Sequence, residues 1–223
     1  MISATSTWRA ITPVVFRILE RCWVDKFFET GELRLSSFAK FREHTDEQRK
    51  DNEGANIITL RGESTTAFAV LGHGYDAYIL CATSLEPSQS ILQRFSCDAA
   101  IQVFDTMAFA NALSSYVTGF RGGYAGHCAY TARSIQVKVK DVDIDSFRTY
   151  PGSNDIDANK AGMYFLNAAG AAVYFRKAAT PTFIEQAEYR WVFLTSGDAQ
   201  QTITIRAPEA RQFCLPWYPA SER

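Results

Sequence analysis

The stretch from Thr182 to Ser196, TFIEQAEYRWVFLTS, constrains the fold more than any other part of the chain, because its side chains alternate with the two-residue period of a β-strand. Apolar side chains fall on one face of the extended chain: Ala187, Tyr189, Trp191 and Phe193. The other face carries an amide, a carboxylate and a guanidinium: Gln186, Glu188 and Arg190. The apolar face predicts a buried sheet. The polar face is either an ordinary solvated surface or a site, and this segment alone leaves both open.

The size and composition of the chain favour one folded domain. The 223 residues contain no segment typical of a linker, so we predict a single α+β domain over 1–223. Hydrophobic residues make up 47% and aromatic residues 13%, enough for a substantial core. With 23 basic and 24 acidic residues, the chain has no global charge to attract nucleic acid or an anionic membrane, although a local basic patch is compatible with this balance.

Cysteine usage and the N-terminal sequence bear on the cellular compartment. The chain has 5 cysteines, scattered and without a Cys-x-x-Cys pair, which favours reduced thiols over a disulfide framework or a zinc site. Charged residues interrupt the N-terminal segment MISATSTWRAITPVVFRILE, so it resembles neither a signal peptide nor a membrane span. We therefore expect a cytoplasmic protein without a membrane segment or a bound metal.

Hydrophobic periodicity predicts short strands interrupted by helices, without the regular alternation of a doubly wound sheet. Helices are expected at 14–28, 87–95, 106–120 and 157–177. Strands are expected at 32–38, 56–64, 66–72, 77–84, 99–104, within 127–142, at 182–196 and at 201–207. The last two are expected to pair as a hairpin. The fold class is therefore α+β, with a mostly antiparallel sheet that could be split in two, and flanking helices.

The segment from Phe41 to Gly54 is almost entirely polar and charged. It is either a solvated loop or a polar site. Its carboxylates Asp46, Asp51 and Glu53 leave open a metal-dependent nuclease, which would need them to converge on a cation.

Three segments together resemble a large group of poorly characterised bacterial proteins: FETGELRLSSFAKFREHTDEQRKDNEG, YILCATS and KAATPTFIEQAEYRWVF. Their order, with an early arginine strand, a middle serine strand and a late Glu strand, also resembles the toxin and phage-defence branch of the ADP-ribosyltransferases. This resemblance implies an ADP-ribosyltransferase-like fold and NAD as a substrate. It implies a nucleic acid or protein acceptor, with an antitoxin or chaperone as a candidate partner.

The resemblance also implies roles for individual residues. Glu188 would be the catalytic glutamate and Gln186 its partner on the same strand. The NAD contacts would come from Arg34, Arg42, Arg49 and Ser84, with Arg61 as a rival to Arg34. Ala82 stands where the family has a first serine, and the charged loop is unusual for such enzymes. A non-catalytic phosphate-binding, nucleic-acid-binding or scaffold module is the alternative of a different class.

Overall fold

A computed structural model describes residues 12–38, 40, 55–131, 134–199 and 201–219. Contacts within the chain divide it into two compact units. The first unit comprises Met1–Leu33, Ala82–Tyr116 and Ile205–Arg223, and the second comprises Arg34–Cys81 and Val117–Thr204. Each unit is therefore assembled from separated stretches of sequence. The expectation of a single domain over 1–223 stays a prediction.

The elements are mostly short strands. Those of the first unit are β1 (Val15–Leu19), α1 (Arg21–Thr30), α3 (Gln89–Arg94), β6 (Ala99–Val103), α4 (Thr106–Ser114), the 3₁₀ helix η2 (Pro208–Phe213) and β13 (Cys214–Trp217). Strands β2 (Glu32–Ser37), β5 (Ala77–Thr83) and β12 (Ile203–Arg206) have residues in both units. In hydrogen-bonding order the larger sheet runs β12-β2-β5-β1-β6-β13, and β11 (Glu188–Thr195) joins β5 and β7 (Phe120–His127).

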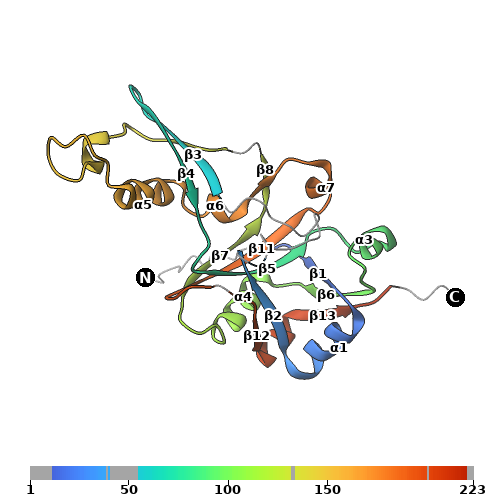
Figure 1. Cartoon of the computed structure of the whole chain (residues 1–223). Helices are drawn as coiled ribbons and strands as arrows, with labels where there is room; N and C mark the ends of the chain where they lie inside the picture. The colour runs from blue at the N-terminus through green and yellow to red at the C-terminus, as the bar shows by residue number, and fades with distance from the viewer. Residues whose placement is uncertain (1–11, 39, 41–54, 132–133, 200, 220–223) are drawn as a thin grey trace, which may run out of the picture. The chain divides into compact units, whose positions relative to one another are not determined.

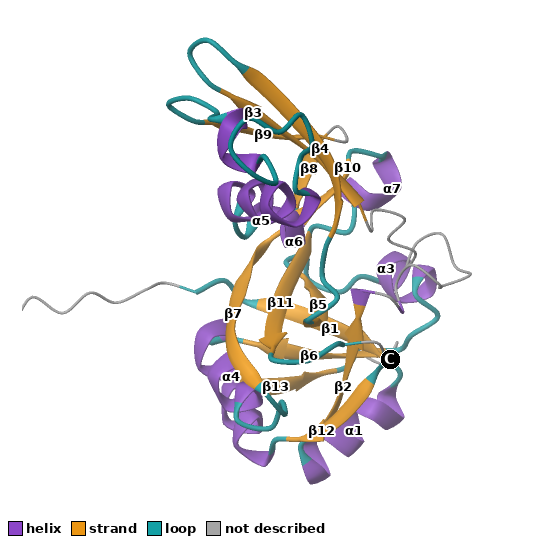
Figure 2. Cartoon of the chain, turned by 60° about the vertical axis from the view of Figure 1, so that its left-hand side comes forward, coloured by secondary structure: helices purple, strands orange, loops and turns teal. Residues whose placement is uncertain are grey.

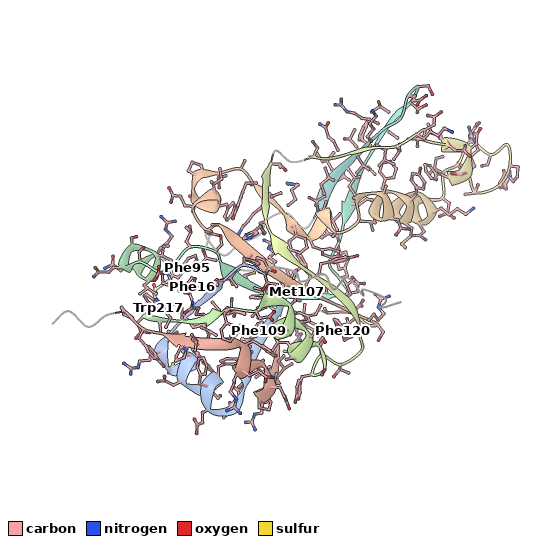
Figure 3. All side chains as sticks on the ribbon, turned by 180° about the vertical axis from the view of Figure 1, so that it is seen from behind. Phe16, Phe95, Met107, Phe109, Phe120 and Trp217 are labelled. Carbon is pink, nitrogen blue, oxygen red and sulfur yellow. The ribbon has the colours of Figure 1, made fainter. Side chains whose placement is uncertain are left out.

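The first unit is built on antiparallel pairing of β1 with β6 and of β6 with β13 (Figure 1). Helices α1 and α4 supply its aromatic core. Phe27 of α1 meets Phe109 of α4 edge to face, with ring centroids 6.5 Å apart, and Phe109 is labelled in Figure 3. Helix α1 ends at Gly31, whose φ of 76° is left-handed and whose N–H bonds to the carbonyl of Phe27 at 2.7 Å. Glycine adopts this conformation without a steric cost, so the sequence fixes the end of α1.

The second unit contains the remaining elements. They are β3 (Ala55–Arg61), β4 (Thr66–Gly72), β7, β8 (Ala129–Thr131), β9 (Ser134–Lys138), η1 (Ile144–Phe147), α5 (Ala158–Ala169), α6 (Ala172–Phe175), β10 (Arg176–Ala178), α7 (Pro181–Ile184) and β11. Strands β4, β3 and β9 form a three-stranded sheet in that order, and helix α5 packs against one of its faces (Figure 2). The contact buries Ile58 and Leu60 of β3 with Phe165 of α5. This apolar cluster follows from the alternation of β3 and the amphipathic face of α5.

Strand β11 is the interior strand that the sequence predicts, but both of its faces are buried. Tyr189, Trp191 and Phe193 are buried as expected. Glu188 and Arg190, on the other face, are also buried, with 6% and 3% of their surface exposed. The interpretation of this face as a solvated surface is therefore wrong. A strand buried on both faces must satisfy its charged groups inside the protein.

Tertiary structure overrides the sequence in three places. Residues 15–19 form β1 where a helix was expected, because the backbone of all five residues pairs with β6, and Val15 and Ile18 are β-branched. Residues 181–184 form α7, capped by the Thr180 hydroxyl, so β11 starts only at Glu188. Strand β12 pairs with β2, so the hairpin expected between 182–196 and 201–207 is wrong.

Other expected helices form, but they end earlier than the sequence predicts. Asp105 caps α4 by accepting a hydrogen bond from the N–H of Ala108 at 3.0 Å. The helix ends at Ser114, earlier than expected, and 120–127 is strand β7. Gly170, with a φ of 54°, ends α5 and divides the helix expected at 157–177. The α+β class with mostly antiparallel sheets is confirmed. The parallel strand pairs are β3 with β9 and β8 with β10.

Candidate functional site

The first residue of β11 lies at the centre of a buried charged cluster in the second unit. One carboxylate oxygen of Glu188 accepts a hydrogen bond from Lys177, and the other accepts one from Nε of Arg190. Arg190 Nη1 also donates to the backbone carbonyl of Tyr174 at 2.9 Å. Glu188, Lys177 and Arg190 are all more than nine-tenths buried. The carboxylate is thus held between two cations in a largely water-free interior.

A small parallel sheet brings Lys177 to this carboxylate. Strand β10 pairs with β8 so that Lys177 lies opposite Tyr130. The hydroxyl of Tyr130 accepts a hydrogen bond from the backbone N–H of Glu188 at 2.7 Å. The ring of Phe183, from α7, lies 4.4 Å from Nζ of Lys177, a distance typical of a cation–π contact. Hydrogen bonds and an aromatic face therefore enclose the ammonium group.

Gln186 joins the same cluster, although it does not lie on β11. Its side-chain oxygen accepts a hydrogen bond from Lys177 Nζ at 2.9 Å. Between it and Glu188, Ala187 has a φ of 41°, in the left-handed region that residues with a Cβ rarely adopt. The chain turns at Ala187, so the expectation that Gln186 lies on the strand beside Glu188 is wrong. Lys177 nevertheless bonds to both side chains, so the predicted pair of residues meets at one ammonium group.

The charge state of the cluster follows from competing effects. Burial alone would raise the pKa of Glu188, but the charges and hydrogen bonds of Arg190 and Lys177 outweigh it and lower the pKa to about 2. The carboxylate is therefore ionised at neutral pH. Burial raises the pKa of Tyr130 to about 12, so its hydroxyl stays protonated beside the cluster.

A second buried polar group of side chains adjoins the first through β10. Arg176 precedes Lys177 and donates from Nε to Oδ1 of Asn56 at 3.0 Å. The amide nitrogen of Asn56 lies 3.1 Å from the carbonyl of Val173, to which it donates, and 3.3 Å from Nδ1 of His73. Successive side chains of a strand point to opposite faces, so Arg176 bonds to Asn56 on one face of β10 and Lys177 bonds to Glu188 on the other.

The residues predicted to contact NAD lie at several places. Arg34 is exposed on β2, and Arg61 is exposed at the end of β3. Neither is a partner of Glu188, whose side chain bonds only to Lys177 and Arg190 within the described part of the chain. Ser84 is partly buried and follows β5 in the first unit. Arg42 and Arg49 lie outside the described residues, as do Asp46, Asp51 and Glu53 of the nuclease alternative.

Few features of the sequence indicate the residues that surround Glu188. Lys177 and Arg176 lie in the segment AVYFRKA, where the expected element was a helix. Two adjacent cations between aromatic and alanine residues are the one local signal that these charges are buried. Tyr130 carried no such signal, because only the pairing of β8 with β10 brings it to the site.

Among the residues that the structure describes, no group of three or more His, Cys, Asp or Glu side chains is arranged to hold a metal ion. No helix within the described ranges has the length and apolar character needed to cross a membrane. No family model, curated protein or solved structure matches this chain. The site must therefore be interpreted from its own chemistry.

Proposed function

We propose that the protein is an NAD-dependent ADP-ribosyltransferase, a toxin or antiviral effector, that modifies nucleic acid or protein. The observation that carries the proposal is Glu188: an ionised carboxylate in a largely water-free interior, at the start of a central strand. Perturbed carboxylates of this kind are concentrated at functional sites, although structural ion pairs also produce them. The resemblance in motif order assigns the catalytic role to the same residue.

The chemistry suits a permanently charged carboxylate. The bond between nicotinamide and the ribose C1′ breaks with its electron pair passing to nicotinamide, which leaves positive charge on the ribose. A nucleophile of the acceptor then bonds to C1′ and releases a proton. A fixed carboxylate beside the ribose stabilises the positive charge far better in a dry site than in water. The step needs no metal or redox cofactor.

The resting arrangement sets a requirement on this reaction. Lys177 and Arg190 occupy both oxygens of Glu188, and two cations beside a developing positive charge would oppose the reaction. Catalysis therefore requires the NAD diphosphate to draw at least one of these cations away from Glu188. Arginine and lysine are the side chains best suited to bind a diphosphate. Substrate binding would thus expose the carboxylate and neutralise its former partners together.

The decisive experiment measures nicotinamide release and transfer of labelled ADP-ribose to RNA, DNA or protein. Glu188→Gln is expected to abolish both. This substitution also leaves Lys177 and Arg190 without an anion. It must therefore be compared with Glu188→Gln combined with Lys177→Met, in which one anion and one cation are removed together and the net charge of the cluster equals that of the wild type. If the double variant regains stability but not turnover, instability does not explain the loss of activity, and Lys177→Met alone shows how much of the loss comes from the lysine. Glu63→Gln, at an exposed carboxylate in the turn after β3, is the matched control and should retain full activity.

The second candidate is a non-catalytic phosphate-binding or nucleic-acid-binding module. The full engagement of both Glu188 oxygens favours it, because a structural ion pair needs no further partner. In that case NAD would neither turn over nor raise the Tm of the wild-type protein. Turnover that is unchanged in Glu188→Gln would reject the proposed site even with the activity established.

A further inference from the structure

Among the described residues, helix α5 covers one face of the sheet β4-β3-β9, and large apolar side chains are exposed on the other face. Helix α5 covers the face that carries Ile58 and Leu60. The opposite side, which we call the outer face, carries the alternate residues of each strand: Thr66, Phe68, Val70, Gly72, Ile57, Thr59, Arg61, Ser134, Gln136 and Lys138. A sheet face with a hydrophobic interior side normally has a polar outer side. The exposed apolar residues of the outer face therefore suggest that a binding partner covers it.

Aromatic and aliphatic side chains are grouped along β4. Phe68 is 76% exposed and Val70 is 63% exposed, although both are large apolar residues on a regular strand. Tyr75, 51% exposed, returns over the end of the same strand, since a Cβ added to Gly72 would lie 2.8 Å from its hydroxyl oxygen. Gly72 thus leaves room for the tyrosine on the outer face. Two exposed rings, with Val70 between them, line one edge of the sheet.

Two cations lie in the row next to Phe68, at the end of the sheet opposite to Gly72 and Tyr75. In register, Phe68 is opposite Thr59, which is opposite Gln136, and the next row of the same face places Arg61 opposite Lys138. Among the described residues, the strands present no carboxylate on this face. The nearest acids are in the turns beyond it, where Asp141 accepts hydrogen bonds from Ser64 and from the N–H of Val142. Glu63 lies in the adjoining turn and is exposed.

We propose that this outer face binds single-stranded nucleic acid. Exposed aromatic rings on a sheet stack on unpaired bases, and neighbouring cations contact the phosphates. The cations favour a polyanion over an apolar protein partner or a second copy of this chain. Binding here would be tolerant of sequence, because every base offers a π-face, and strongly dependent on salt. The proposal does not depend on Glu188, and it stands or fails independently of NAD turnover.

The test uses the purified full chain and fluorescent 12-nucleotide RNA and DNA strands, with Kd measured by anisotropy from 50 to 200 mM salt. Phe68→Ser should weaken binding roughly tenfold, the loss expected when one stacked base is lost. Lys138→Gln should lessen the slope of log Kd against log salt by about 0.7, as for one phosphate contact on a single strand. The matched duplex should bind more weakly than either strand, since its bases are not free to stack.

Tyr150→Ser serves as the matched control, because Tyr150 is 65% exposed but lies in the loop after η1, outside the outer face. Its Kd should equal that of the wild type. The proposal is overturned if no strand binds at 50 mM salt, or if Phe68→Ser and Tyr150→Ser have the same Kd. It is also overturned if the wild type is a dimer in solution and Phe68→Ser converts it to a monomer, because the face then binds a second copy. Equal Tm values for the variants would show that the fold is intact.

Discussion

The two units differ in what they bury. In the first unit, the described polar side chains that are buried are hydroxyls, Thr83 and Thr106, while Phe27, Phe109 and Leu113 fill its centre. Every buried charged side chain of the described residues belongs to the second unit: Arg176, Lys177, Glu188 and Arg190. Both interiors contain apolar clusters, and among the described residues only the second unit also buries charged side chains.

This difference supports the proposed site in the second unit. Apolar burial stabilises a fold without further requirements, at about 25 cal/mol per Å². Buried ions carry a desolvation penalty of several kcal/mol each, which their mutual attraction offsets only in good geometry. The second unit keeps four such ions, so it accepts this desolvation penalty and holds charge at a defined position.

The largest expected effect comes from removing the anion of the cluster. Glu188→Ala should lower the free energy of unfolding by about 3–5 kcal/mol, because Lys177 and Arg190 would be left buried without a counterion. Urea unfolding measures the loss, and hydrogen exchange locates it. Amides of β11 should lose protection while those of β6 keep it. Equal loss in both strands would show that the two units unfold together.

Phe109→Ala is the counterpart in the first unit. It should also cost about 3–5 kcal/mol, through the cavity left in an apolar core. The two variants should differ in their response to pH, since Glu188 is an ionisable residue and Phe109 is not.

Acid should therefore weaken the second unit through Glu188. Its pKa is depressed in the folded protein, so its stabilising contribution is fully present above the ordinary value of 4.5 and is lost as the pH falls toward about 2. The difference in unfolding free energy between the wild type and Glu188→Gln should shrink over this range. A difference that stays constant from pH 5 to pH 2 would contradict the ionised state of Glu188.

A medium effect is expected at Gly31 in the first unit. Gly31→Ala would place a Cβ 2.4 Å from the backbone nitrogen of Pro208 and would add strain at a φ of 76°. We expect a loss of about 2 kcal/mol or more in thermal or urea unfolding, since backbone atoms cannot move aside as a side-chain end can. Gly197→Ala is the control, because nothing lies within 4 Å of its added Cβ and its φ is unstrained.

The smallest expected effect is a gain in stability, in the second unit. Ala187→Gly should stabilise the protein by about 0.5–1 kcal/mol, because glycine relieves a left-handed φ of 41° at little cost. If the strain serves to bring Gln186 and Glu188 to Lys177, the same variant should also reduce NAD turnover. A gain in stability with unchanged turnover would limit Ala187 to a structural role.

Local patterns in the sequence predicted much of the fold. The strand expected at 66–72 forms with those bounds, and the Asp105 cap and the left-handed Gly31 act through neighbouring residues, so such elements are predictable independently of the tertiary structure. The candidate site was predicted only in part. Glu188 and Gln186 were expected to act together, and they share Lys177, but the sequence did not identify Lys177 or Arg190 as their partners.

What the sequence determined by itself is the α+β class and the placement of most strands, because periodicity, caps and turn residues are properties of short segments. Only the tertiary structure decided that 15–19 is a strand and that β12 pairs with β2, since these depend on distant partners. It also decided that Glu188 and Arg190 are buried. Alternation shows which side chains share a face, whereas the elements that pack on that face determine whether it is exposed to water.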